Sequence, residues 1–416
     1  MELNKMQKHN NIINAIDVGT SKICILSAEQ LSEKHTQIIG FSSVETNGLD
    51  KGNVSDQEAI TLGIAKVKSN LENATGMPIT NAYSNISGSH IEIKAISNSQ
   101  GNKLENKIIT PEDLFIYKQN IGQKHKVLDQ EKVIIENLNT KYKIDNSFEI
   151  KNPTGMHRSN MESVNKVITG EVKITNKLEG SIKDAGIKTL DFVSSISASG
   201  EANLLESEKS GQTIVIDIGA GVTDIGVYNY GDLEFVKTLP VGGMNFSKDI
   251  SFVTGISIKN AEELKLKYGS AQWDITNSDT VNSTNEETGD PIVIDIRDII
   301  LLTRERAMEL SQLIRVSLEK IYEENNDVQF ILTGGGANLP GLTNLLSKNF
   351  CSPVRIGQPN ISSRKFKDML NDKKYSTLIG TLCLANKNLT SDHVNYNHLE
   401  NQNLQLSKNI FSKLLP

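Results

Sequence analysis

Two stretches far apart in the chain share one pattern of apolar and polar positions. Residues 12–26 read IINAIDVGTSKICIL, and residues 213–228 read TIVIDIGAGVTDIGVY. Each places β-branched runs on both sides of a glycine turn, which is the pattern of a strand-turn-strand hairpin. Because the pattern occurs twice, the sequence predicts a duplicated α/β domain whose two halves each contribute one glycine turn to a shared cleft.

Apolar residues at helical spacing predict three helices. The first begins at a capping box formed by Ser55 and Glu58 and ends at Gly76; the second begins at Thr110. The third is a long amphipathic helix over residues 296–322. The apolar faces of the three helices are, in order, Ile60, Ile64, Val67 and Leu71; Leu114, Tyr117 and Ile121; and Leu310, Ile314, Leu318 and Ile321.

Two other segments differ from this α/β pattern. Residues 89–161 contain the strand-like stretches IEIKAIS and VIIENLNTKYKI, and they are interpreted as a small α+β insertion in the first half. After Ala385 the chain becomes rich in asparagine and other polar residues, which is the composition of a linker.

Charge and cysteine content narrow the class of protein. The 416 residues include 44 Lys and Arg against 50 Asp and Glu, so bulk charge gives no reason to expect a nucleic-acid partner. Cys24, Cys351 and Cys383 are far apart, which argues against a metal clip or a disulfide framework and favours a reducing cytoplasm. Neither a secretory leader nor a membrane-spanning run of ~20 apolar residues is expected.

A third glycine turn follows an apolar strand in ILTGGGANLPGL, residues 331–342. Phosphates are bound by backbone N–H groups that no side chain obstructs, and glycine permits that approach. A single glycine turn more often serves only to connect two strands. Three such turns, two of them preceded by an aspartate at the strand end, favour a nucleotide cleft.

Asp17 and Asp217 end their strands beside Gly19 and Gly219. A carboxylate at this point can hold the water shell of a Mg²⁺ ion that bridges nucleotide phosphates, without ligating the metal directly. The alternative for each is an aspartate that caps its own turn. Lys22 likewise has two interpretations, a point charge for a phosphate or an exposed hairpin lysine.

The three glycine motifs resemble, in order and spacing, the two phosphate motifs and the adenosine motif of the actin, Hsp70 and sugar-kinase superfamily. YSTLIGTLCLA, residues 375–385, resembles the superfamily's connecting helix. Within the superfamily, the details resemble the FtsA family of bacterial cell-division proteins. The segments that carry this resemblance are DVGTSK, SASGEANLL, LPVGGMNFSKDI, AEELKLKYG and KNPTGM.

The resemblance implies an α/β, actin-like ATPase fold: two duplicated RNase H-like domains around a nucleotide cleft, with a small α+β insertion of the 1C type. It divides the first half into a polar tail (residues 1–11) and a domain 1A (12–88 and 162–199) with an inserted domain 1C (89–161). The second half is a domain 2A (200–385) with an insertion 2B (around 245–325). A linker (386–403) and an amphipathic membrane helix (404–416) follow.

The resemblance also assigns site residues, with ATP and Mg²⁺ as cofactors and no direct metal ligand. The first phosphate turn would be Gly19, Thr20, Ser21 and Lys22, and the second Gly219, Ala220, Gly221, Val222 and Thr223. Gly334, Gly335 and Gly336 would pass beside the adenine, and Glu262 and Lys265 would contact the ribose and base edge. By spacing alone, the last two form a solvated helix ion pair.

Two departures from related sequences affect the expected chemistry. Many relatives have Gly-Gly-Gly-Thr at the second turn; here one hydroxyl donor is missing, and Thr223 must serve. Relatives that hydrolyse ATP place Gln or Glu before the second phosphate motif, where this chain has serines at 194, 195 and 197. Serine orients water poorly and does not act as a base at neutral pH. The serine at position 195 therefore predicts at most slow hydrolysis of ATP.

The last residues form an amphipathic pattern. Leu406, Ile410, Phe411, Leu414 and Leu415 fall on one face of a helix, with Lys408, Asn409, Ser412 and Lys413 opposite. The pattern alone fits either a membrane-surface helix or a tail that docks on the protein's own surface. The resemblance favours the membrane.

The function implied by the resemblance is that of an ATP-binding adaptor. It would tether the tubulin-like division protein FtsZ to the inner face of the cytoplasmic membrane at the division site, and help assemble the Z ring and septal machinery with other copies of itself. Arg304 and Arg306 are the candidate contact for the C-terminal peptide of FtsZ, the alternative being a solvated helix face. A PilM-like adaptor of pilus assembly and a small-metabolite kinase are the rival functions.

Overall fold

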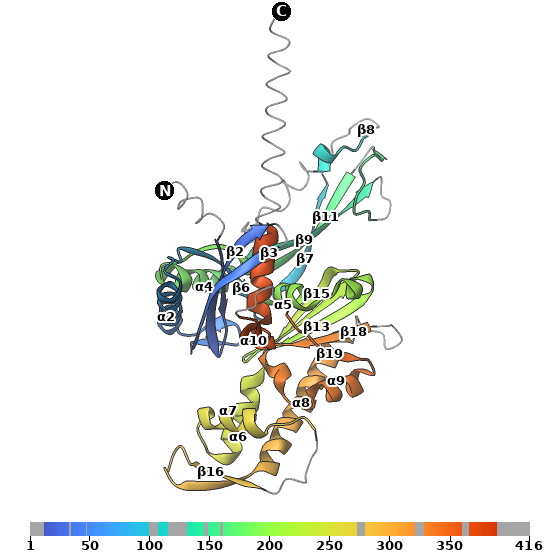
Figure 1. Cartoon of the computed structure of the whole chain (residues 1–416). Helices are drawn as coiled ribbons and strands as arrows, with labels where there is room; N and C mark the ends of the chain where they lie inside the picture. The colour runs from blue at the N-terminus through green and yellow to red at the C-terminus, as the bar shows by residue number, and fades with distance from the viewer. Residues whose placement is uncertain are drawn as a thin grey trace, which may run out of the picture.

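Two five-stranded sheets with the same connectivity form the two halves of the molecule (Figure 1). The first has the strand order β12-β6-β1-β2-β3, and the second has the order β15-β14-β13-β18-β19. In both, three antiparallel strands joined by hairpins continue into two parallel strands. The predicted duplication of an α/β domain is therefore confirmed.

The computed structural model describes residues 12–32, 35–46, 48–99, 107–114, 131–144, 149–158, 161–272, 279–319, 321, 328–359 and 366–388. The strands of the first sheet are β1 (Ile12–Val18), β2 (Lys22–Ser32), β3 (His35–Glu45), β6 (Asn81–Ile86) and β12 (Lys188–Ser194). Those of the second sheet are β13 (Gln212–Ile218), β14 (Thr223–Asn229), β15 (Asp232–Leu239), β18 (Val328–Thr333) and β19 (Val354–Ile356).

Helices α2 (Gln57–Thr75) and α4 (Val172–Asp184) lie side by side against the first sheet (Figure 1). The helix α2 ends, as predicted, at Gly76, which is in the left-handed conformation with φ 69°. The predicted capping box is wrong, because the N-cap is Asp56 rather than Ser55 and its carboxylate accepts a backbone hydrogen bond from the first turn. The buried face is the predicted one, Ile60, Ile64, Val67 and Leu71.

The segment after residue 88 forms a separate three-stranded antiparallel sheet that projects from the first half (Figure 1). Its strands are β7 (Glu92–Ser99), β11 (Met161–Glu171) and β9 (Lys132–Ile144), with a short pair β8 (Lys107–Ile108) and β10 (His157–Arg158) nearby. The sheet extends to residue 171, because β11 starts where the sequence placed the end of the insertion. Of the helix predicted from Thr110, residues 111–114 are helical; Tyr117 and Ile121 lie outside the described residues.

Helices and a hairpin complete the second half, and some of these helices pack against its sheet. They are α6 (Gly243–Thr254), α7 (Ile258–Tyr268), the hairpin β16 (Thr280–Thr284) and β17 (Pro291–Asp295), α8 (Ile296–Leu318) and α9 (Leu342–Phe350). The predicted long helix is thus present, but it ends at Leu318 rather than at residue 322. Within the described residues, no helix is both long and apolar enough to cross a bilayer.

The last described element is a helix over residues 376–388, drawn red at the centre of Figure 1. It continues three residues beyond 385, where the sequence predicted a linker. Its buried Leu378, Ile379 and Leu382 belong to one core cluster with Ile13 and Leu26 of the first sheet. Because the helix follows the second half in sequence but packs on the first, it links the two halves.

Candidate functional site

The two predicted phosphate turns have the same backbone geometry. The Gly19 N–H donates to the Lys22 carbonyl, and the Gly219 N–H donates to the Val222 carbonyl, both at 2.9 Å. A Cβ atom added at Gly221 would lie only 2.3 Å from Oγ1 of Thr20. The two turns, one from each half, are therefore in direct contact, and glycine at 221 is what permits the approach.

The third glycine turn covers the end of β13. Gly334 has φ 86°, and an added Cβ would lie 2.2 Å from the Oδ1 oxygen of Asp217. At Gly336 a Cβ would lie 2.3 Å from the side chain of Ile218. The short helix η2 (Gly335–Asn338) follows. The structure thus brings together the three glycine turns that are more than a hundred residues apart in sequence.

Asp17 is buried at the end of β1 and is held from a neighbouring strand. The Asn85 amide donates to Asp17 Oδ1 at 3.0 Å and to Ser195 Oγ at 2.9 Å. Burial raises the pKa of Asp17, while the positive charge of Lys22 and the Asn85 hydrogen bond oppose that rise. Ser195, which occupies the predicted water-positioning site, therefore shares one amide group with Asp17.

Asp217 is buried at the matching position of the second half, and its partners are hydroxyl groups. Its Oδ2 oxygen accepts a short hydrogen bond from Ser199, on α5 (Ser195–Asn203), and one of 2.9 Å from Thr377. Burial raises the pKa of Asp217, and the two hydroxyl donors act in the opposite direction. Both carboxylates are thus kept in place at the mouth of the cleft.

Asp224 is a third buried carboxylate, which the sequence analysis did not assign. It lies opposite Asp217 in the hairpin and accepts hydrogen bonds from Ser87, at 2.8 and 2.7 Å, and from Thr238, at 2.5 Å. Burial raises its pKa to about 7. Ser87 belongs to the first half, so this contact crosses the cleft. A signal was available, because an aspartate on an otherwise apolar strand requires a partner.

Helices α6 and α7 form a further wall against the second turn. The N–H groups of Gly243 and Met244 donate to the carbonyls of Gly219 and Ala220, both at 2.8 Å. The Thr223 hydroxyl, expected to serve a phosphate, is fully buried and donates to the Val241 carbonyl at 2.8 Å. The second turn therefore presents backbone groups to the cleft.

Glu262 and Lys265 lie on α7 beside this wall. Lys265 Nζ contacts Glu262 Oε2 at 2.6 Å and donates to the Gly243 carbonyl at 3.0 Å, and Ser247 also bonds to Glu262. The Lys265 side chain is 12% exposed. The pair is consequently more than a solvated ion pair on one helix, since it braces α7 against the first turn of α6.

The residues present fit a nucleotide with Mg²⁺. Two buried carboxylates, one from each half, lie at the ends of the strands that lead into the two phosphate turns, and Asp217 also touches the third glycine turn at Gly334. Lys22 supplies one ammonium group, which lies 5.4 Å from the ring centre of Tyr375. In the part of the chain that the structure describes, no three His, Cys, Asp or Glu residues cluster to hold a metal ion. This donor set suits a metal held through water and phosphate.

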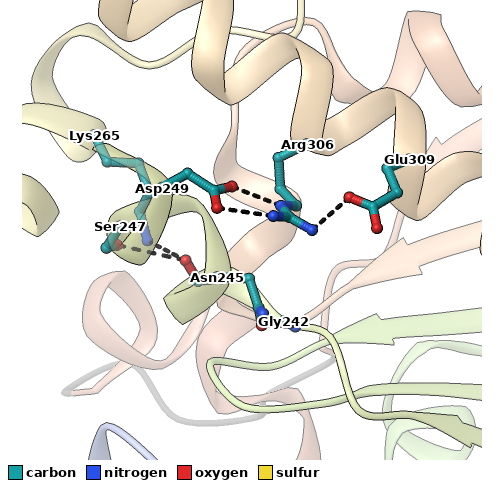
Figure 2. A network of polar contacts seen from close by, with 8 residues as sticks. Gly242, Asn245, Ser247, Asp249, Lys265, Arg306 and Glu309 are labelled. Carbon is teal, nitrogen blue, oxygen red and sulfur yellow. Dashed lines mark hydrogen bonds and ion pairs between the residues drawn. The ribbon is translucent and has the colours of Figure 1, made fainter. Parts of the chain in front are cut away.

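The structure separates the two arginines proposed for partner binding. Figure 2 shows Arg306 between Asp249 of α6 and Glu309 of α8; its guanidinium makes two bonds to Asp249, at 2.6 and 2.8 Å. Arg304 instead lines a groove of about 900 Å³ between α8 and α9. The groove-lining side chains include Met308 and Gln312 of α8 and Asn344, Leu345 and Lys348 of α9. Of the two arginines, Arg304 lines this groove, whereas Arg306 pairs with Asp249.

The predicted membrane-binding residues Leu406, Ile410, Phe411, Leu414 and Leu415 lie outside the described residues.

Comparison with solved structures identifies the fold. The chain is similar to the PilM-PilN type IV pilus biogenesis complex, with a TM-score of 0.62 and 16% identity over 90% of this chain and 98% of that one. It is also similar to MreB5 of Spiroplasma citri bound to ADP, with a TM-score of 0.52 and 14% identity over 91% of this chain and 98% of that one. The predicted actin-like ATPase fold is confirmed.

Comparison of sequences identifies the family. A family model described as Cell division protein FtsA matches residues 214–380. The Cell division protein FtsA of Buchnera aphidicola subsp. Baizongia pistaciae is 30% identical over 401 residues, covering 90% of this chain and 91% of the relative. That of Bacillus subtilis is 27% identical over 387 residues, covering 91% and 84%. The chain therefore belongs to the FtsA family of cell-division proteins.

Proposed function

We propose that this chain is an ATP-binding adaptor that attaches FtsZ filaments to the cytoplasmic face of the inner membrane at the division site. The observation that carries the proposal is the convergence of three glycine turns on Asp17 and Asp217. Two MreB5 structures with this fold are described as bound to ADP and to AMPPNP, which supports a nucleotide in the same cleft.

Each group in the cleft has a role in this proposal. The backbone N–H groups of the two turns and the Lys22 ammonium bind phosphate oxygens, and Asp17 and Asp217 orient the water shell of Mg²⁺. Bound Mg²⁺ would neutralise phosphate charge. Loop 334–336 and the Glu262–Lys265 pair hold the adenosine. Because the turns come from different halves, nucleotide binding stabilises the closed arrangement of the molecule.

We further propose that the groove at Arg304 takes the C-terminal peptide of FtsZ. The groove combines the cations Arg304 and Lys348 with the apolar Met308 and Leu345. Such a lining suits a short peptide that has both acidic and apolar residues. In this arrangement Arg306 has a different role, since its pair with Asp249 ties α8 to α6.

Two charge reversals on α8 test the groove. Arg304→Glu should weaken binding of a synthetic FtsZ tail peptide by about tenfold or more, because it places like charges against the peptide. Arg315→Glu is the matched control, since Arg315 lies on α8 but does not line the groove. Equal peptide affinity for the Arg304 and Arg315 variants, measured by fluorescence anisotropy, would place the FtsZ site elsewhere.

The membrane contact is proposed for residues 404–416. Burying one Leu-sized side chain contributes roughly 1.5–3 kcal/mol, and a lysine near anionic lipid contributes about 1 kcal/mol. Ordering a short tail opposes binding by roughly 1–2 kcal/mol per residue. A single tail should therefore bind weakly, and copies aligned in an assembly should bind strongly through their combined tails.

Flotation with anionic liposomes tests this proposal. Phe411→Glu should abolish flotation of the ATP- or FtsZ-assembled protein. Asn409→Glu is the matched control, because it adds the same charge on the polar side of the expected helix. A Phe411→Glu variant that floats like the wild type would show that the tail is not the anchor.

A further inference from the structure

The segment 372–377 contacts several parts of the candidate nucleotide site. The Lys373 ammonium donates to Asn338 Oδ1 at 2.5 Å, beside the adenosine loop. Tyr375 lies under Lys22 of the first phosphate turn, 5.4 Å from Nζ to the ring centre. Ser376 and Thr333 share a buried hydrogen bond of 2.7 Å. The segment therefore joins the adenosine loop, the first phosphate turn and the end of β18.

The last residue of this segment reaches the acidic centre of the second half. The Thr377 hydroxyl donates to Asp217 Oδ2 at 2.9 Å and lies 3.1 Å from the Ser199 hydroxyl, which bonds to the same carboxylate oxygen. Hydrogen bonds to an ionised acceptor are stronger than those between neutral groups. Two hydroxyls, from two different helices, thus fix the orientation of one buried carboxylate.

The helix that begins here is packed tightly between the two halves. A Cβ added at Gly380 would lie 1.7 Å from the Ala198 carbonyl oxygen, so helix 376–388 and α5 touch backbone to backbone. One turn later, Leu382 and Ala385 are buried in the core cluster that includes the first sheet. A helix held this closely moves as a rigid element when its first turn moves.

We propose that Thr377 is the positioning residue of Asp217, and that through this hydrogen bond helix 376–388 follows the closing of the nucleotide cleft. The inference rests on the proposed nucleotide function. Asp217 would hold the water shell of bound Mg²⁺, and the Thr377 bond would then fix the first turn of the helix relative to the second half. The helix carries the chain toward residues 389–416, so nucleotide occupancy is transmitted toward the proposed membrane tail.

The test compares three variants of the full-length chain. Thr377→Val removes the hydroxyl at nearly constant shape, Thr377→Ser retains it, and Thr381→Val is the matched control. Thr381 lies one turn further along the same helix and is fully buried, whereas Thr377 is partly buried, and the Thr381 hydroxyl donates to the Thr377 carbonyl rather than to Asp217. Two quantities are measured with ATP: affinity with Mg²⁺ relative to affinity in EDTA, and hydrogen-deuterium exchange of residues 376–388.

In the wild type, we expect ATP with Mg²⁺ to slow exchange in residues 376–388. Thr377→Val should lower the Mg²⁺-dependent part of the ATP affinity by about tenfold and remove the nucleotide effect on exchange. Thr377→Ser should restore both quantities, and Thr381→Val should resemble the wild type. If Thr377→Val does not fold, Thr377→Cys replaces it, because a thiol is of similar size but a weak donor.

Two negative results have different meanings. If ATP binds the wild type and Thr377→Val alike, with the same slowing of exchange, Thr377 does not position Asp217 and the inference is overturned. If the wild type itself shows no ATP binding, the proposed nucleotide function fails, and the inference fails with it. Ser199→Ala adds a further check. It should weaken Mg²⁺-dependent ATP binding, but saturating ATP should still slow hydrogen-deuterium exchange in residues 376–388, because Thr377 is intact.

Discussion

The two phosphate turns have the same backbone but different side chains. In each turn, the N–H of the first glycine donates a hydrogen bond of 2.9 Å to the carbonyl of the residue three positions later. The first turn carries two hydroxyl groups and an ammonium group, whereas the second consists of Ala220, Gly221 and Val222 after its first glycine. Side-chain donors for a phosphate are therefore concentrated in the first half.

The hydrogen-bond donors that hold the two acidic residues also differ between the halves. Asp17 is held by Asn85, an amide within its own half, whereas Asp217 is held by hydroxyls from α5 and from helix 376–388. Asp224, which has no acidic counterpart at Cys24 of the first hairpin, adds a contact across the cleft. Under the proposed nucleotide function, the first half would contact the phosphates, and the second would couple the nucleotide site to the rest of the molecule.

Replacing Asp217 should have the largest effect on nucleotide binding. Asp217→Asn should weaken Mg·ATP by about a hundredfold, equal to about 2.8 kcal/mol, and abolish the ATP-dependent gain in melting temperature. Without nucleotide, the variant should be as stable as the wild type or more so, because burial of the ionised carboxylate opposes folding. Calorimetric titration and thermal melts measure the two quantities.

Asp17→Asn tests whether the acidic residues of the two halves have different roles. It should weaken Mg·ATP similarly but leave the nucleotide-dependent exchange of residues 376–388 intact at saturation, since Asp17 is not bonded to that helix. The same loss of coupling in both variants would contradict the different roles assigned to the two halves.

The next largest expected effect is a dependence of the free energy of unfolding on pH, caused by Asp224. An unfolded Asp ionises near 3.9, but the folded protein retains the Asp224 proton up to a pKa of about 7. Between these values the folded chain binds more protons, so its free energy of unfolding falls as pH rises from about 4 to 7. Asp224→Asn should remove this slope and stabilise the protein at pH 8 by on the order of 2 kcal/mol.

Urea unfolding of the two proteins at pH 5 and pH 8 measures that difference. Thr238→Val is a useful companion, because it removes one of the hydroxyl donors that stabilise the ionised form. It should therefore raise the pKa of Asp224 further and enlarge the total loss of stability between pH 5 and pH 8. A wild-type stability that rises steadily from pH 5 to 8 in parallel with Asp224→Asn would show that this carboxylate ionises normally.

A smaller effect is expected from a methyl group at the contact between the turns. Gly221→Ala would place a Cβ 2.3 Å from Thr20 Oγ1, whereas Gly19→Ala meets the Lys22 carbonyl at 3.1 Å. Gly221→Ala should lower the free energy of unfolding by about 1–2 kcal/mol and Gly19→Ala by less. Adding Thr20→Ala should recover part of the Gly221→Ala loss; denaturant unfolding that shows no recovery would mean the turns do not press on each other.

Much of this fold follows from residue patterns, and the exceptions have physical reasons. The duplicated hairpins and the face of α2 were predictable because buried strands and helices repeat apolar residues at fixed spacing. Cap residues were not, because Ser55 and Asp56 are both good N-caps and only geometry selects one. Likewise, residues 386–388 are all polar but helical, since the helix to which they belong is anchored by its earlier apolar residues.

The site was predictable at its glycines and less so at its polar supports. A glycine turn after a strand is a local signal, and Gly221 and Gly334 indeed lie where no side chain fits. The partners of Asp217 come from residues 18 and 160 positions away, and no local pattern relates them. Similarly, the arginines of α8 are two residues apart, so a helix directs them to different sides, Arg304 to the groove and Arg306 to Asp249.

The smallest effect is expected at Ser195, the first residue of α5. Its hydroxyl accepts the Asn85 hydrogen bond, and Asn85 also holds Asp17, so the residue is a buried part of the first half's support and not an isolated position beside the phosphates. Ser195→Glu would introduce the carboxylate that can orient water, but it would do so beside the Asp17 charge. Repulsion between the two carboxylates raises the pKa of both groups and so lowers the ionised fraction of the new glutamate.

We therefore expect Ser195→Glu to raise phosphate release only two- to threefold, equivalent to about 0.5 kcal/mol in the barrier. Ser195→Ala, which removes the hydroxyl without adding a base, should leave the slow rate unchanged. Release of labelled phosphate under single-turnover conditions separates the three proteins. A wild-type rate in the ordinary kinase range of ~1–100 per second would contradict the expectation, because the first half would then contain a water-positioning group other than Ser195.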